Sequence, residues 1–297
     1  MQLQDYVNDV QELIHDAIGV SWPVARVISR INDARRVTSM DMKCVRSLVT
    51  GVQLLQNQEI YNLNGAVAGA NVTSGGSNYG AGLTVPVTFT SAPAGGVTAL
   101  GFGNLSGGVL TSITLTQWGQ GYTAAPAVTV GGIGTGAGAT AVTLINLLYP
   151  ITITYIFNGI RTTLRYIEFP LFQAYARILG IQFASTPGAW TVMPQAQQIY
   201  IQPPPNQLYL SEWDCTFFTS PLVNLTDFDS QIQDPWTLAP QFAAAAFLLM
   251  KDQDAGRARV GFMQRQYDAM VPKIVTGIGD VRIPNIYNRN FQRMVAR

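Results

Sequence analysis

The residues best suited to chemistry are few in this sequence and lie far apart. The single histidine, His15, falls in an acidic amphipathic segment with no nucleophile near it, so the sequence does not indicate a Ser-His or Cys-His pair. Cys44 and Cys215 match no metal-ligand spacing, and we expect both to be reduced, buried side chains, as suits assembly in a reducing cytoplasm. No hydrolase, zinc-protease, dithiol or phosphate-loop motif occurs. We therefore expect no enzyme, no metal and no cofactor.

Acidic residues are the next candidates for a catalytic or calcium site. Glu212 and Asp214 fall on one face of a predicted strand, which is compatible with paired carboxylates but also with an ordinary exposed strand. Three further acids follow, namely Asp227, Asp229 and Asp234. Their segment lacks the glycine of an EF-hand loop, so we expect solvated loop carboxylates there. The run 131–136 has the glycine density of a dinucleotide loop, but a Thr-rich strand rather than a helix follows it.

The C-terminal segment offers a stronger candidate for binding. It contains four arginines and no acids from Val281 to Arg297, with aromatic and apolar residues interleaved. Such a segment can grip nucleic acid, dock on an acidic protein surface, or fray as an ordinary terminus. Four arginines are few for nonspecific DNA binding, so we expect an extended arm that orders on a partner protein. Its expected contact residues are Arg282, Ile286, Tyr287, Arg289, Phe291, Arg293 and Arg297.

A neutral, glycine-rich segment divides the chain that would position these groups. The stretch from Asn64 to Ala141 holds 19 of the 28 glycines, and no charged residue occurs between Glu59 and Arg161. Short runs of β-branched residues and Thr alternate with Gly clusters, which predicts strands at 85–90, 110–117 and 127–130. The pattern Gly-x-x-Tyr occurs twice, at 76–79 and 119–122, and is followed by Pro86-Val87-Thr88-Phe89 in the first copy and by Pro126-Ala127-Val128-Thr129-Val130 in the second. We expect a folded β-module with a weak two-fold repeat.

The flanking segments predict helices at both ends of the chain and a hairpin region between. Apolar residues at spacings of three and four predict a first helix on Tyr6, Val10 and Leu13, and a second that begins near an N-cap at Ser21. A capping-box pattern starting at Thr38 predicts a third helix as far as Val52. Later elements are a hairpin around Asn158-Gly159, strands at 190–193, 198–202 and 208–218, and helices at 241–250 and 254–275.

These elements give an α+β fold class, with a helical bundle built from the N- and C-terminal segments and antiparallel β elements. The expected parts are an N-terminal helical part of the core (1–63), the inserted β-module (64–145), a hairpin region with C-terminal helices that completes the core (146–276), and the basic arm (277–297). At 297 residues and 47% apolar content the chain has room for more than one domain. We expect no signal peptide and no transmembrane helix, since the first residues are acidic and the longest uncharged stretch is rich in Gly and Thr.

Charge is unevenly divided between the first helices. The first carries Asp5, Asp9, Glu12 and Asp16, whereas six basic residues and two acids occur between Ser21 and Arg46. The net charge of +1 argues against a dedicated nucleic-acid binder. The opposite charges predict either pairing within the chain or contact between neighbouring subunits of opposite sign in an assembly.

The order of these parts resembles the head-to-tail adaptor proteins of short-tailed bacteriophages. The residues that carry the resemblance are 6–11 with 13–16, 31–36, Asp41 with 44–46, 58–63, the Gly-rich repeat, and 234–236 ahead of Pro240 and its Ala-rich helix. The resemblance implies a helical protein with β elements that forms a dodecameric ring under the portal. It also implies partners, namely the portal protein, the tail nozzle and tail fibres, with DNA passing only as cargo. The location would then be the head-tail junction of a virion assembled in the host cytoplasm, without membrane contact.

Two other functions remain open at this stage. A carbohydrate-binding or receptor-binding tail protein could use the aromatic residues of the neutral β-module. A wall-degrading enzyme is the third reading, and the missing catalytic constellation argues against it.

Overall fold

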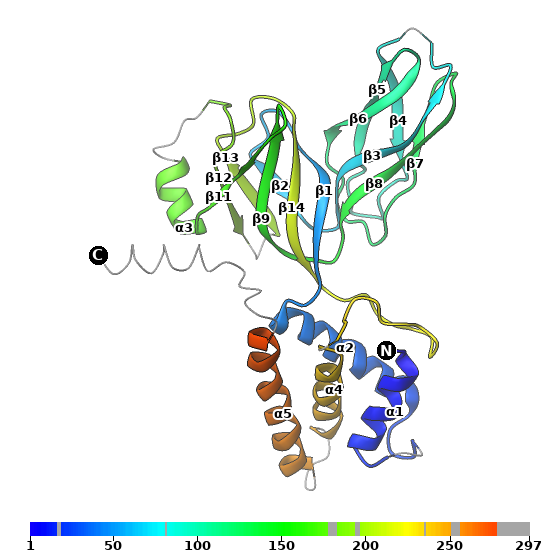
Figure 1. The fold of residues 1–297 in the computed structure, drawn as a ribbon, viewed down its shortest axis with the longest axis vertical. Helices are drawn as coiled ribbons and strands as arrows, with labels where there is room; N and C mark the ends of the chain where they lie inside the picture. The colour runs from blue at the N-terminus through cyan, green and yellow to red at the C-terminus, as the bar shows by residue number, and fades with distance from the viewer. Residues whose placement is uncertain are drawn as a thin grey trace. The chain divides into compact units, whose positions relative to one another are not determined.

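The computed structural model describes the chain except for residues 17–18, 81, 178–182, 194–196, 235, 251–255 and 278–297. It divides into two compact units. One unit is helical and combines the two ends of the chain, Met1–Arg46 and the part from Thr216 onward. The other unit is Ser47–Cys215 and consists mainly of strands (Figure 1). The chain therefore leaves the helical unit once, builds the β unit, and returns.

The predicted fold class was wrong about which kind of structure dominates. Strands account for 42% of the chain and helices for 25%, arranged as four sheets and a few short helices rather than as a helical bundle with β additions. One cause is local: the segment 46–54, expected as part of a third helix, forms a sheet strand instead. Its Val and Thr residues are β-branched and pack well on a pleated surface.

The helical unit begins with α1 (Leu3–Leu13) and α2 (Val24–Met42). In α1, Tyr6 and Val10 are fully buried, as their spacing predicted. The expected N-cap at Ser21 was wrong, since α2 is capped at Pro23. The Asp16 carboxylate instead accepts hydrogen bonds from the backbone N–H groups of Val20, Ser21 and Trp22, which fixes the turn between the two helices.

The Ala-rich helix α4 (Ala239–Leu249) lies at the centre of this unit. It packs against α1, α2 and α5 (Gly256–Gly277), and a short 3-10 turn (Trp236–Leu238) leads into it (Figure 1). Residues 243–246 are four alanines, all buried, and their small side chains allow the other helices to approach closely. Met263 and Tyr267 of α5 complete the apolar core, and the Tyr267 hydroxyl donates a hydrogen bond to Asp41 of α2. No helix in the described part of the chain is long and apolar enough to span a bilayer.

The predicted third helix was also wrong. The backbone turns into the left-handed region at Lys43, with φ of 52°, and then enters strand β1 (Arg46–Leu54). Thr38 and Ser39, the start of the capping-box pattern, are buried inside α2 instead. A local capping pattern is worth about 1 kcal/mol, and pairing of β1 with a neighbouring strand outweighs it.

Two four-stranded sheets form the body of the β unit (Figure 1). Their orders are β1-β14-β9-β10 and β11-β12-β13-β2. The strands are β2 (Ile60–Asn62), β9 (Leu147–Phe157), β10 (Ile160–Thr163), β11 (Arg165–Tyr166), β12 (Ala189–Met193), β13 (Gln198–Gln202) and β14 (Tyr209–Phe217). A short helix α3 (Phe169–Leu171) and a π-helical turn (Phe172–Arg177) follow β11.

Several local predictions in this body are confirmed. Asn158 and Gly159 have φ of 50° and 77° and join β9 to β10, with Phe157 opposite Ile160. Positive φ at both turn residues is what a type I′ hairpin requires. The predicted strands at 190–193, 198–202 and 208–218 correspond to β12, β13 and β14.

The Gly-rich segment forms a β-module between β2 and β9. Its strands are β3 (Ala66–Ser77), β4 (Thr84–Phe89), β5 (Leu100–Ser106), β6 (Val109–Gln117), β7 (Val128–Val130) and β8 (Thr135–Leu144). β3 pairs with β8, and the other four form a sheet of order β6-β5-β4-β7. The strands of the two repeat copies, β4 and β7, pair with each other so that Thr88 lies opposite Thr129. The weak sequence repeat is therefore also a pairing in space.

The module joins the body of the β unit through close backbone approach and a buried amide. A Cβ atom at Gly69 of β3 would overlap the carbonyl oxygen of Gly51 in β1, so only glycine permits this approach. The Gln53 side chain, 2% exposed, donates to the Ile113 carbonyl at 2.6 Å and accepts from the Leu115 N–H at 2.7 Å. This amide continues the hydrogen-bond ladder of β6 onto β1.

Candidate functional surfaces

A buried ion pair is the most elaborate polar arrangement in the helical unit. Arg35 of α2 donates through Nε to Asp229 Oδ2 at 2.7 Å and through Nη2 to Oδ1 at 2.8 Å, and the side chains are 1% and 0% exposed. Asp229 also accepts from the Tyr6 hydroxyl at 3.3 Å and from the backbone N–H groups of Gln231 and Ile232. Burial is the main reason that the pKa of Tyr6 is raised, with the Asp229 charge adding to it. The phenol therefore stays a donor.

The same stretch of α2 holds the loop that returns from the β unit. Arg35 Nη1 donates to the Ser220 carbonyl at 2.7 Å, and Asn32 makes two hydrogen bonds to the backbone of Leu222, each 2.9 Å long. The N-terminal residues complete the contact, since Leu3 N–H donates to the Asp227 carbonyl. This network fastens the two ends of the chain into one unit. Every hydrogen-bonding group of the pair is used within the protein, so we assign it a structural role.

The acids of α1 lie outside its buried core stripe. Asp5 and Glu12 are exposed, and Asp9 is half-buried beside Gln241 of α4, which donates to its carboxylate at 2.8 Å. Burial raises the pKa of the Asp9 carboxyl, and the nearby charges of Asp5 and Glu12 raise it further. No ion pair joins these three acids to a cation among the described residues. The outer face of α1 is therefore an uncompensated acidic surface.

The outer face of α2 has the opposite sign. Arg26 stacks over the Trp22 ring at 4.8 Å, and Arg36 stacks over the Phe218 ring at 4.3 Å. Asp33 on this face is already paired with Arg30 at 2.7 Å. Stacking uses the flat face of a guanidinium group, so it does not consume the N–H donors, which lie in the plane of the group.

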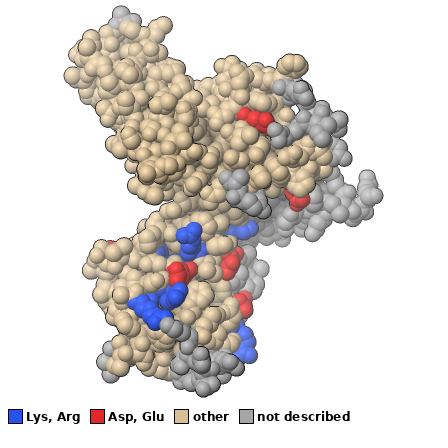
Figure 2. Space-filling view, turned by 180° about the vertical axis from the view of Figure 1, so that it is seen from behind, with Lys and Arg blue, Asp and Glu red and all other residues tan. Residues whose placement is uncertain are grey.

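Charge is distributed very differently on the β unit. Figure 2 shows Lys, Arg, Asp and Glu gathered over the helical unit, whereas the β unit displays almost none on this face. Its ionisable acids and bases are Glu59, Arg161, Arg165, Glu168, Arg177, Glu212 and Asp214, three basic and four acidic. All of them lie outside the Gly-rich module.

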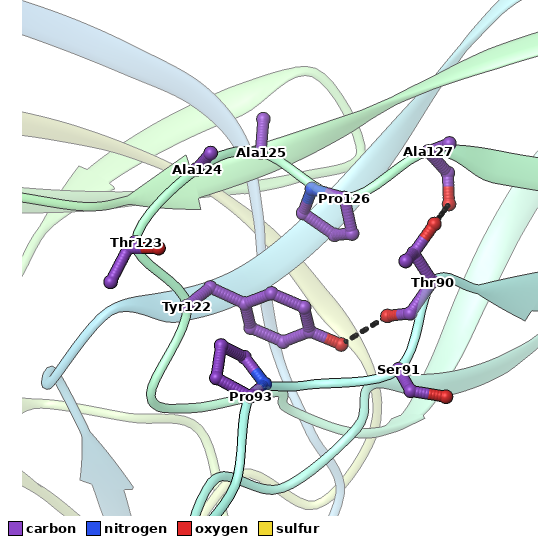
Figure 3. A pocket seen from close by; sticks show the side chains of 9 residues that line it. All are labelled: Thr90, Ser91, Pro93, Tyr122, Thr123, Ala124, Ala125, Pro126 and Ala127. Atoms are coloured by element: carbon purple, nitrogen blue, oxygen red, sulfur yellow. Dashed lines mark hydrogen bonds between the residues drawn. The ribbon is translucent and has the colours of Figure 1, made fainter.

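Two shallow, uncharged hollows open on the β-module. The first, about 340 Å³, is lined by Thr90, Ser91, Pro93 and residues 122–127. Figure 3 shows the Tyr122 ring between Pro93 and Pro126, with its hydroxyl donating to the Thr90 carbonyl at 2.8 Å. The second, about 640 Å³, is lined by residues that include Asn78, Leu83 and residues 105–108. Each hollow lies beside the loop that carries one copy of the repeated Gly-x-x-Tyr pattern.

The aromatic rings of the module are mostly buried. Tyr79, Phe89, Trp118 and Tyr122 are 6–8% exposed, and Phe102 is half-buried. Trp118 packs against Tyr61 and Trp213 of the sheet body, with ring centroids 4.7 and 5.8 Å away. These rings stabilise the module and do not offer a flat, open platform for stacking a sugar.

The carboxylates and the histidine singled out by sequence do not converge. His15 is exposed just beyond α1, and Asp227 accepts from the backbone N–H groups of Val223 and Asn224, which lowers the pKa of its carboxyl. Asp234 binds the Thr237 hydroxyl instead. Within the described residues, no group of three or more His, Cys, Asp or Glu side chains is placed to hold a metal.

The remaining candidates also have structural partners. Glu212 pairs with Arg161 through two contacts of 3.1 Å, and the hydrogen bond from Arg161 lowers the pKa of its carboxyl. The run 131–136 follows β7 and includes the first two residues of β8, so it leads into a strand rather than a helix, as expected. Both cysteines are free thiols: Cys215 is buried and Cys44 half-buried.

The predicted arm residues, Arg282, Ile286, Tyr287, Arg289, Phe291, Arg293 and Arg297, lie outside the described residues, so their role stays a prediction. Sequence reasoning missed the Arg35–Asp229 pair. A signal was present, because Arg35 falls on the same helical stripe as Val27, Ile31 and Thr38, where a buried charge demands a partner.

Comparison with known proteins adds no family to this picture. Neither a scan against known protein families nor a search of curated proteins found a match to this chain.

Proposed function

We propose that this chain is a ring-forming head-to-tail adaptor of a short-tailed bacteriophage, which joins the portal to the tail, extends the DNA channel and helps to retain packaged DNA. The observation that carries the proposal is the helical unit itself. Residues 31–36, part of the resemblance to such adaptors, supply Asn32 and Arg35, which fasten the returning loop to the N-terminal helices. Residues 31–36 thus help to join the two ends of the chain into one helical unit.

The arrangement of charge supports an assembly role. A ring subunit needs two different side faces that complement each other, because a heterologous interface repeated around an axis closes into a ring. The helical unit carries an acidic face on α1 and a basic face on α2. A catalytic cleft is not required for such a role.

The β unit suits a part of the ring that does not grip DNA. Its three basic and four acidic side chains give a net charge of −1, which offers the phosphate backbone no electrostatic attraction. In this proposal DNA passes the ring only as cargo. The partners are other copies of the chain, twelve by the resemblance, together with the portal protein, the tail nozzle and tail fibres, at the head-tail junction of the virion.

Electron microscopy of the full chain mixed with the portal protein of the same phage tests the proposal. Rings of the chain capping the portal are expected. A chain that stays monomeric beside the portal at high concentration would overturn it. A variant lacking Val281–Arg297 should lose portal binding while the helical circular dichroism signal stays nearly unchanged, and retained binding would refute the docking role of the arm.

The adaptor is preferred over a carbohydrate-binding or receptor-binding tail protein because the rings of the module are buried and its hollows are shallow and uncharged. A glycan array separates the two functions. An adaptor gives no signal on the array. Specific glycan binding by a variant that lacks the basic arm (277–297) would favour the tail protein.

A further inference from the structure

We propose that the acidic face of α1 in one copy docks on the basic face of α2 in a second copy, and that this contact is the repeating interface of the assembly. The acidic face comprises Asp5, Asp9 and Glu12, and the basic face comprises Arg26 and Arg36. The inference rests on the proposed function, because it names the partner surface that a ring of this chain would use.

Pairing within the chain was the competing explanation for the opposite charges, and the structure does not favour it. In the described part of the helical unit, Arg30 pairs with Asp33 within α2, and Arg35 pairs with Asp229 of the returning loop. Neither joins α1 to α2. Glu12 is exposed, and the described residues place no cation against it. Both faces therefore keep their charge available to another molecule.

The basic face is also held in a conformation ready for contact. Stacking of Arg26 on Trp22 and of Arg36 on Phe218 restricts the rotamers of both side chains, so less conformational entropy is lost when a carboxylate binds. Met40, one turn after Arg36 on α2, is 46% exposed. It supplies apolar area beside that charge, which an interface of charges alone would lack.

The placement of the two faces on different helices allows a head-to-tail assembly. Contact of two α1 faces, or of two α2 faces, would bring like charges together at a cost of several kcal/mol. A two-fold pair with each α1 on the α2 of the other copy would use both faces and stop at a dimer. In the head-to-tail arrangement that we propose, each pair keeps one free face of each sign, so further copies add until the rotation per copy completes a full turn.

Charge reversal in the full-length chain tests the inference by sedimentation velocity over a range of protein concentrations and salt. Glu12→Arg places like charges opposite Arg26 and Arg36, and Arg36→Glu places like charges opposite α1. Each is expected to weaken self-association about tenfold or more, and salt is expected to weaken the wild type. Arg165→Glu, which reverses an exposed charge in the β unit, is the matched control and should change association less than about twofold.

Mixing the two variants gives the decisive result. In a 1:1 mixture the reversed α1 of Glu12→Arg faces the reversed α2 of Arg36→Glu, and the unreversed faces also match, so association should return to within about threefold of wild type. A folding defect in either variant would not be repaired by mixing. Unchanged association in both variants, no recovery on mixing, or a wild type that stays monomeric at low salt would each overturn the inference.

The outcome is separate from that of the proposed function. If both variants still form rings on the portal, the adaptor proposal stands and this interface is wrong. If the variants behave as expected but the wild type ignores the portal, the interface stands and the adaptor proposal falls.

Discussion

Removing one partner of the Arg35–Asp229 pair should unfold the helical unit far more readily than removing an exposed partner elsewhere. In Asp229→Leu the Arg35 guanidinium, 1% exposed, loses two charge-assisted hydrogen bonds and remains buried. The Tyr6 hydroxyl and two backbone N–H groups lose their acceptor as well. Breaking a buried ion pair costs about 3–5 kcal/mol, a large share of the roughly 5–15 kcal/mol that stabilises a typical domain.

Equilibrium denaturation followed by circular dichroism at both helix and strand wavelengths measures this loss in the helical unit and that of the control in the β unit. The matched control is Glu212→Leu, which removes the partner of Arg161 in a pair whose arginine side chain is 63% exposed. That change should cost about 0–1 kcal/mol. The double variant Arg35→Met with Asp229→Leu removes both charges, so it should be more stable than Asp229→Leu alone.

Two results would refute the reasoning. Equal losses in Asp229→Leu and Glu212→Leu would mean that burial does not set the cost of an unpaired charge here. A double variant less stable than either single variant would mean that packing of the two side chains, rather than compensation of charge, holds the loop to α2.

Three further predictions concern other parts of the chain. Gln53→Met leaves a carbonyl and an N–H of β6 buried without partners, so thermal unfolding of the β unit should show a loss of about 2–4 kcal/mol, and Gln53→Asn should not restore it because its amide is too short. Gly134→Ala puts a Cβ into the Tyr79 ring and should cost about 1–3 kcal/mol in the same assay, whereas Gly82→Ala, whose Cβ would lie 3.7 Å from the Thr84 carbonyl oxygen, an ordinary contact, should be nearly neutral. Burial raises the pKa of the Cys44 thiol to about 11, so at pH 8 iodoacetamide should label the folded thiol at least tenfold more slowly than the unfolded one. Because the thiol ionises at lower pH in the unfolded chain, the raised pKa of Cys44 also makes the free energy of unfolding depend on pH: its contribution is present below about pH 8.5 and is lost as the pH rises through 11.

The elements predicted well are those whose signal is local. The hairpin at Asn158-Gly159 needs only the positive φ that these two residues adopt readily, and the strands of the module follow from alternation between Gly clusters. The prediction of a third helix was wrong because it rested on a local capping pattern. The conformation of 46–54 depends instead on pairing with β14, more than 150 residues later in the chain. Intrinsic helix and strand propensities carry no information about such a distant partner strand.

The ion pair shows the same limit for the functional surfaces. Arg35 and Asp229 are 194 residues apart, and Asp229 resembled one of three solvated loop acids until the fold brought it under α2. The charge asymmetry between α1 and α2 was visible in the sequence, but the sequence left open whether it would be neutralised within the chain. The structure shows that Arg30 and Arg35 pair with Asp33 and Asp229, and that neither pair involves an acid of α1.

The helical unit and the β unit differ in the interactions that stabilise them, and the distribution of charged residues explains the difference. The helical unit uses one buried pair to fasten its chain ends and keeps Arg26, Arg36 and Glu12 at the surface, where they cost little and remain available for contact. The β unit has no charged residue between Glu59 and Arg161. Aromatic packing, a buried amide and close glycine contacts that admit no side chain stabilise this part instead. Charge within the described residues is therefore concentrated on the helical unit (Figure 2). If the proposed interface is right, charge reversal on its outer faces should alter assembly, whereas changes in the module should alter stability.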